Sequence, residues 1–179
     1  MKLTEQASTM KFATILLLFA ATVFAEDKVL FILNYPKVHF LNKISTVRLP
    51  SRSQVSETFE DVTSTVSGWG RDSDDSSSIT PILRWVENPV IQNFVCNVLF
   101  FGSITDGHIC TSGTGGKGTC NGDSGGPLTV LESDGQITQV GIVSFGISFG
   151  CEIGWPLAFA RVTYYLDWIA ATTGIPIRN

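Results

Sequence analysis

Short apolar runs separated by turn residues constrain the fold of this chain more than any other feature of its sequence. They recur as Val62–Val66, Leu83–Val86, Ile109–Thr111, Leu128–Leu131 and Thr138–Phe145. Each run has the length of a strand, and Val, Ile, Thr and Phe are residues that strands favour. Glycines and polar loops lie between the runs. The pattern predicts an all-β domain, either a barrel or a sandwich.

The C-terminal stretch has a different pattern. Leu166, Ile169 and Ala170 recur at helical spacing. Thr163 is placed to cap the start of a helix, and Gly174 is placed to end it. We expect one C-terminal helix packed against the β domain.

The first 25 residues have the layout of a secretory signal peptide. Lys11 supplies the basic start, residues 12–24 are apolar but short for a membrane span, and Ala25 ends a small-residue cleavage site. The alternatives are a buried core helix or a membrane anchor. We expect a secreted, extracellular chain that has no membrane contact after cleavage.

Four cysteines are present, at Cys96, Cys110, Cys120 and Cys151. In a secreted chain an even number predicts disulfides, and four cysteines allow three pairings. A zinc site is the competing hypothesis, but the sequence has no CxxC pair and no histidine at ligand spacing. We expect two disulfides, no metal and no cofactor.

Charge excludes one class of partner. The formal net charge is −4, and no Lys/Arg cluster is present that would follow a phosphate backbone. We expect no nucleic-acid binding. The acidic and serine-rich stretch at 71–78 is interpreted as a solvated surface loop, not a metal site.

Residues 118–128 read GTCNGDSGGPL and place Ser124 on a glycine-rich turn. A serine becomes an effective nucleophile only when a base takes its proton. The segment Gly122–Pro127 resembles the nucleophile motif of trypsin- and chymotrypsin-like serine proteases. Further matches to that family are Ser67–Gly70, Val143–Gly146, Phe159–Val162 and Leu166–Ile169. The resemblance covers about residues 29–173 and is closest to chymotrypsin-like digestive enzymes of arthropods.

The resemblance implies a trypsin-like serine protease fold with a C-terminal antiparallel β-barrel, a C-terminal helix and an N-terminal barrel that is largely absent. It divides the chain into a signal peptide (1–25), a remnant of the N-terminal barrel (26–50), a linker (51–61) and the C-terminal barrel with its helix (62–179). The barrel face that normally packs on the first barrel would then be exposed and would favour association.

The resemblance also implies roles for the nucleophile turn. Ser124 would attack the scissile carbonyl of a peptide or protein substrate. The turn of Gly122, Asp123 and Ser124 would form the oxyanion hole, with the N–H groups of Gly122 and Ser124 as donors. The disulfide pairs implied by the family are Cys96 with Cys110 and Cys120 with Cys151.

For substrate binding, the resemblance implies a pocket with Gly118 at its floor, where trypsins carry Asp. Ser144 would face the bound peptide, Gly146 would leave the pocket wall open, and Leu157 would narrow the pocket. An uncharged floor favours apolar or small substrate side chains. The alternative for Leu157 is simple packing in the core.

The sequence departs from the family at its catalytic base. Neither His39 nor His108 lies in a segment that matches the catalytic histidine. Asp27 is a candidate for the aspartate that orients this base, and the alternative is a solvated acid beside the signal cleavage site. No I-V-G-G segment supplies the amine that pairs with Asp123, so we expect an unpaired carboxylate there and a disordered or precursor-like oxyanion hole. We predict a secreted serine-type endopeptidase family member that is itself inactive; the alternative is a non-catalytic homologue acting as a binding or decoy protein.

Overall fold

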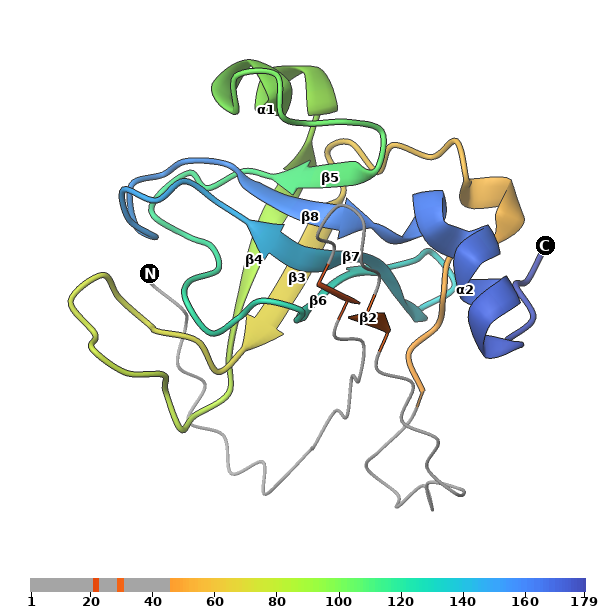
Figure 1. Ribbon diagram of the computed structural model, residues 1–179, viewed down its shortest axis with the longest axis horizontal. Coiled ribbons are helices and arrows are strands. Elements are labelled where there is room, and N and C mark those ends of the chain that lie inside the picture. The colour runs from red at the N-terminus through yellow and green to blue at the C-terminus, as the bar shows by residue number, and fades with distance from the viewer. Residues whose placement is uncertain (1–20, 23–28, 31–45) are drawn as a thin grey trace.

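Six strands form a closed antiparallel barrel in the spatial order β3-β4-β5-β8-β7-β6 (Figure 1). They are β3 (Thr63–Gly68), β4 (Arg84–Ile91), β5 (His108–Thr111), β6 (Pro127–Leu131), β7 (Ile137–Phe145) and β8 (Leu157–Arg161). The structure is a computed structural model that describes residues 21–22, 29–30 and 46–179. It confirms the all-β prediction and decides for a barrel over a sandwich.

The core of the barrel follows from the alternation of side chains along its strands. In β4 the buried residues are Val86, Asn88 and Val90, with the residues between them exposed. Phe159 of β8 and Ile109 of β5 are fully buried in the same core. Burying a side chain of this size stabilises the fold by about 1.5–3 kcal/mol. The alternation therefore fixes which face of each strand turns inward.

One helix in the barrel domain was not anticipated. Helix α1 (Asn93–Leu99) follows β4, and it begins after Gln92, whose side chain makes no capping hydrogen bond. The cap position is thus not occupied by the Ser, Thr, Asp or Asn that usually precedes a helix in a sequence. Cys96 holds α1 to β5 through a disulfide to Cys110. The helix therefore depends on a tertiary bond, which residue propensities do not report.

The predicted C-terminal helix is present, although its start differs from the prediction. A 3₁₀ turn, η2 (Val162–Tyr165), leads into α2 (Leu166–Thr173), which lies at one end of the barrel (Figure 1). Gly174 ends α2 in the left-handed conformation, as expected. The predicted cap by Thr163 is wrong: its buried hydroxyl has no hydrogen-bond partner in the described residues, because η2 precedes the helix.

The segment before β3 packs onto the barrel. It contains η1 (Arg52–Gln54), and Phe59 enters the barrel core with 4% of its surface exposed. Arg48 forms an isolated bridge with Thr138, and the N–H of Arg52 donates to the carbonyl of Arg178 at 2.9 Å. The C-terminus therefore helps to hold this segment in place.

Two short strands, β1 (Ala21–Thr22) and β2 (Val29–Leu30), form a separate antiparallel pair. Residues 1–20, 23–28 and 31–45 lie outside the described residues, and with them Asp27, His39 and most of the predicted signal peptide and barrel remnant. The proposed division of the chain into four parts stays a prediction. None of the described helices has the length and apolar character needed to span a bilayer.

Candidate active site

The turn that carries Ser124 lies between β5 and β6 and is held by its own backbone. The N–H of Asp123 donates to the carbonyl of Cys120 at 3.0 Å, and the N–H of Gly126 donates to that of Asp123 at 2.9 Å. The N–H of Gly125 donates to the carbonyl of Val143 in β7 at 3.0 Å. Ser124 is left exposed at the surface of the turn.

Gly122 shows why this turn is rich in glycine. Its φ is +99°, and a Cβ at this position would lie 2.7 Å from Cγ2 of Ile79. A side chain would therefore be strained by the backbone and blocked by a neighbour. Within the described chain, the N–H groups of Gly122 and Ser124 donate to no acceptor. These two exposed donors are available to an anionic oxygen, which is what an oxyanion hole requires.

Asp123 is buried but is not unpaired, contrary to the expectation from the sequence. Its Oδ1 accepts a hydrogen bond from the N–H of Gly70 at 2.8 Å, and its Oδ2 accepts one from the N–H of Cys120 at 2.9 Å. A Cβ added to Gly68 would lie 2.1 Å from Oδ1. The glycines of the Ser67–Gly70 segment therefore make room for this carboxylate. The turn itself has defined hydrogen bonds, and the expectation of a disordered or precursor-like oxyanion hole stays a prediction.

Burial raises the pKa of Asp123 above its ordinary value, although its two backbone hydrogen bonds act in the opposite direction. An acid whose pKa is higher in the folded state than in the unfolded state stabilises the fold fully when the pH is below its unfolded-state pKa. This stabilisation is lost as the pH rises through the folded-state pKa. We expect the free energy of unfolding of the wild type, relative to Asp123→Asn, to increase between pH 7 and pH 4. Urea unfolding of both proteins at both pH values measures this.

The control for this experiment is Asp75→Asn, because the exposed Asp75 carboxylate makes no hydrogen bond or ion pair within the described residues. Asp75→Asn therefore removes an acidic side chain from the surface without disturbing a buried contact. A wild type that loses stability relative to Asp123→Asn on acidification would contradict the raised pKa.

A cavity of about 230 Å³ lies beside Ser124. Its lining includes Ser144, Gly146 and Leu157, and no described lining residue carries a charged side chain. Gly118 does not line the cavity. A Cβ added to Gly118 would lie 2.3 Å from Cδ1 of Leu157, so the side chain of Leu157 covers Gly118.

Leu157 therefore combines the two interpretations given from the sequence. It is 8% exposed and belongs to the barrel core, and it also lines the cavity. A Cβ added to Gly146 would lie 3.2 Å from its Cδ2, so the side chain reaches both glycines. Leu157 therefore contributes an apolar side chain to the cavity lining beside Gly146.

His108 is packed away from this chemistry. Its Nδ1 accepts a hydrogen bond from the N–H of Thr105 at 3.0 Å, and its ring meets the ring of Phe145 edge-on at 5.5 Å. Partial burial lowers the pKa of His108. In the described residues no hydrogen bond joins His108 to Ser124. His108 is therefore a packing histidine, which agrees with its lack of a match to the catalytic segment of the family.

Both disulfides implied by the family resemblance are present. Cys96 pairs with Cys110 at a Cα–Cα distance of 6.4 Å, and Cys120 pairs with Cys151 at 5.4 Å. The second bridge joins the nucleophile turn to the loop that walls the cavity. Within the described chain, the cluster of potential metal ligands comprises Asp74, Cys120 and Cys151, but the two sulfurs are bonded to each other and are not thiolates.

The polar loop at 71–78 has contacts that the sequence analysis did not anticipate. The N–H of Arg71 donates to the carbonyl of Asn121 at 2.9 Å, directly in the nucleophile turn. Asp74 reaches the loop after Cys151. Composition alone gives no signal for these contacts, since Asp and Ser are equally common in loops that touch only water.

A closed antiparallel barrel with a C-terminal helix and a serine on a glycine turn defines the chain as a relative of serine proteases. A family model described as trypsin matches residues 6–169. Brachyurin from Leptuca pugilator is 48% identical over 132 residues, which cover 74% of this chain and 54% of brachyurin. Collagenase from Hypoderma lineatum is 41% identical over 145 residues, covering 80% of this chain and 53% of the collagenase.

A solved structure of HL collagenase aligns with a TM-score of 0.70 and 43% identity, covering 79% of this chain and 59% of that one. The chain belongs to the trypsin family, and its arthropod chymotrypsin-like affinity is confirmed. The relatives are serine proteases, so this is a serine endopeptidase family. The chain spans about half the length of the curated relatives it matches.

Proposed function

We propose that Ser124 is the nucleophile of a secreted serine endopeptidase site, with peptides or proteins as its substrates or ligands. The observation that carries this proposal is the exposed Ser124 on a turn that requires glycine at 122, together with two N–H groups that donate to no acceptor in the described residues. Ser124 would attack the carbonyl carbon of the substrate, and the N–H groups of Gly122 and Ser124 would stabilise the oxygen as it becomes negative. As the C–N bond of the adduct breaks, the proton lost by the Ser124 hydroxyl would reach the leaving nitrogen, so that an amine departs and an acyl-enzyme remains. Water would then hydrolyse the acyl ester and restore the Ser124 hydroxyl.

The side chain that precedes the cleaved bond would enter the 230 Å³ cavity. We propose an apolar or small side chain there, because the cavity lining is uncharged and Leu157 limits the depth. A Lys or Arg side chain would bury its charge without a partner, which is costly. A site with a carboxylate at its base would instead favour a Lys or Arg side chain.

We also propose that this chain by itself has negligible turnover. His108 is packed against Thr105 and Phe145, and His39 does not match the catalytic position of the family. A general base must be within hydrogen-bond reach of the nucleophile, either directly or through one water. The same observation favours the second candidate function, a non-catalytic homologue that binds peptides or partner proteins through the retained cavity.

A fluorophosphonate probe tests the nucleophile and its activation together. We expect slow labelling of the full chain at neutral pH, and none of the Ser124→Ala variant. Equal labelling of both proteins would show that Ser124 is not the reactive group. Rapid labelling that Ser124→Ala abolishes would support the nucleophile but contradict the lack of a base.

A further inference from the structure

The loop at 71–78 is joined to the cavity wall by three hydrogen bonds between Asp74 and the residues after Gly150. Oδ1 of Asp74 accepts from the N–H of Cys151 at 2.7 Å, and its Oδ2 accepts from the N–H of Glu152 at 3.1 Å. In return, the N–H of Asp74 donates to Oε2 of Glu152 at 2.9 Å. We call these three bonds the Asp74 clasp.

Gly150 permits the close approach on which the clasp depends. Its φ is +143°, and a Cβ there would lie 2.8 Å from Oδ2 of Asp74. From the other side, the guanidinium of Arg71 donates to the carbonyl of Asp74. The hydrogen bond from Cys151 is the main reason that the pKa of Asp74 is lowered, so the carboxylate is ionised at neutral pH. Hydrogen bonds to an ionised acceptor are stronger than those between neutral groups.

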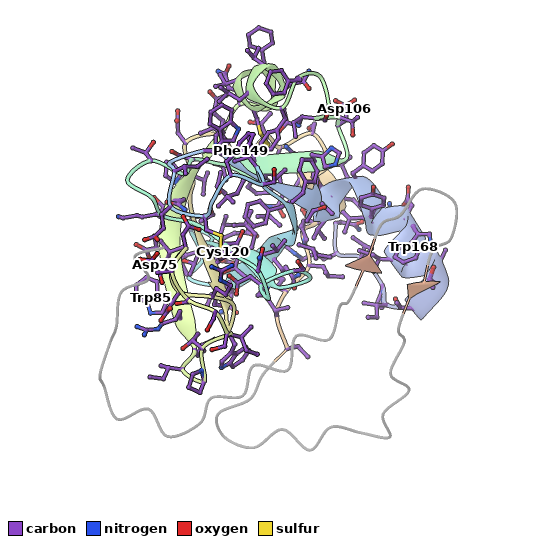
Figure 2. All side chains as sticks on the ribbon, turned by 60° about the vertical axis from the view of Figure 1, so that its left-hand side comes forward. Asp75, Trp85, Asp106, Cys120, Phe149 and Trp168 are labelled. Carbon is purple, nitrogen blue, oxygen red and sulfur yellow. A yellow bond between two sulfur atoms is a disulfide. The ribbon has the colours of Figure 1, made fainter. Side chains whose placement is uncertain are left out.

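The clasp belongs to a series of contacts that joins the loop at 71–78, the cavity wall and the nucleophile turn to one another. Cys151 is bonded to Cys120, and the N–H of Cys120 donates to Asp123. Asp123 in turn accepts from the N–H of Gly70, which stands just before the loop. A carboxylate oxygen of Asp74 and both sulfurs lie within 4.8 Å of one another. Figure 2 shows the loop that carries Asp75 alongside Cys120.

Resting on the proposed function of the cavity, we infer that Asp74 is a positioning residue that sets the substrate side-chain preference by holding the wall formed by residues 146–151. Gly150 and Cys151, which stand at the clasp, both line the cavity. The barrel strands do not contain this wall, since β7 ends at Phe145 and β8 begins at Leu157. The disulfide and the clasp are therefore the contacts that fix the wall from the side of the nucleophile turn.

The test compares Asp74→Ala and Asp74→Asn with Asp75→Ala in the full chain. Asp75 is the matched control, because it is the next residue in the loop and makes no hydrogen bond or ion pair in the described structure. Asn keeps one acceptor oxygen for Cys151, so its effect should be intermediate. Thermal unfolding first establishes that all three variants are folded.

The first measurement is amide hydrogen exchange at Cys151 and Glu152. We expect faster exchange at both amides in Asp74→Ala, with wild-type rates in Asp75→Ala. Unchanged exchange in Asp74→Ala would overturn the inference, because the clasp would then not hold the wall.

The second measurement is the affinity for peptidyl boronic acids whose terminal residue is glycine-like, alanine-like or leucine-like. In Asp74→Ala the ratio of leucine-like to glycine-like affinity should fall about tenfold, which corresponds to about 1.4 kcal/mol. A loss of affinity that is equal for all three ligands would mean a general structural role and would contradict the inference. A wild-type chain that binds none of them would refute the proposed nucleophile site, while amide exchange still decides whether the clasp holds the wall.

Discussion

Incubated with a chromogenic peptide, the full chain should release product at a rate no more than about 10³–10⁴ times that of the uncatalysed reaction. That range is the residual catalysis left when a triad member of a serine protease is removed and its oxyanion hole is kept. Enzymes typically have turnover numbers of about 1–10³ s⁻¹. The expected deficit is therefore many orders of magnitude, the largest effect expected for this protein.

Added imidazole should raise this low rate, because Ser124 is exposed and a small base can approach it from solvent. The rise should be absent in Ser124→Ala, which controls for direct catalysis by imidazole. His108→Ala should leave the rate unchanged, since His108 faces Thr105 and Phe145. A turnover near 1 s⁻¹ without imidazole, or its loss in His108→Ala, would show that the chain does hold a base.

The strands were predictable because burial imposes a period on the sequence. The five apolar runs each became part of β3 to β7, and the alternation in β4 matches the inward positions of the core. Helix α1 was not predictable in this way, because it lacks a capping residue and depends on the bridge from Cys96 to Cys110. The predicted cap by Thr163 failed because the chain enters α2 through a 3₁₀ turn.

The same distinction between local pattern and distant contact applies to the candidate site. The glycine turn that carries Ser124 was expected from a motif that is local in sequence, and the cysteine pairs were expected from the family resemblance. The partners of Asp123 were missed, because they are backbone N–H groups, that of Cys120 and that of Gly70, which is 53 positions away. Gly118 was assigned to the floor, but the covering side chain comes from Leu157 on β8. Contacts between distant backbone groups leave no compositional signal, so structure is needed to find them.

Replacing Cys120 and Cys151 together by serine should lower the free energy of unfolding by about 4 kcal/mol and also disable the candidate site. In the chain-entropy account, removing a crosslink restores freedom to the unfolded state in proportion to the logarithm of the loop length. Here the closed loop spans 31 positions. Urea unfolding under non-reducing conditions measures the loss.

The matched control is the double serine variant at Cys96 and Cys110, a loop of 14 positions that should cost about 3 kcal/mol. The two variants should have similar stability but differ at the site. Of the two disulfides, it is Cys120–Cys151 that joins the nucleophile turn to the cavity wall. The backbone N–H of Cys120 also donates to Asp123. We expect boronic acid binding to be lost in the first variant and kept in the second under conditions where both are folded. Equal loss in both would mean that the bridge near Ser124 acts only through global stability, and the site would then owe its shape to the barrel alone.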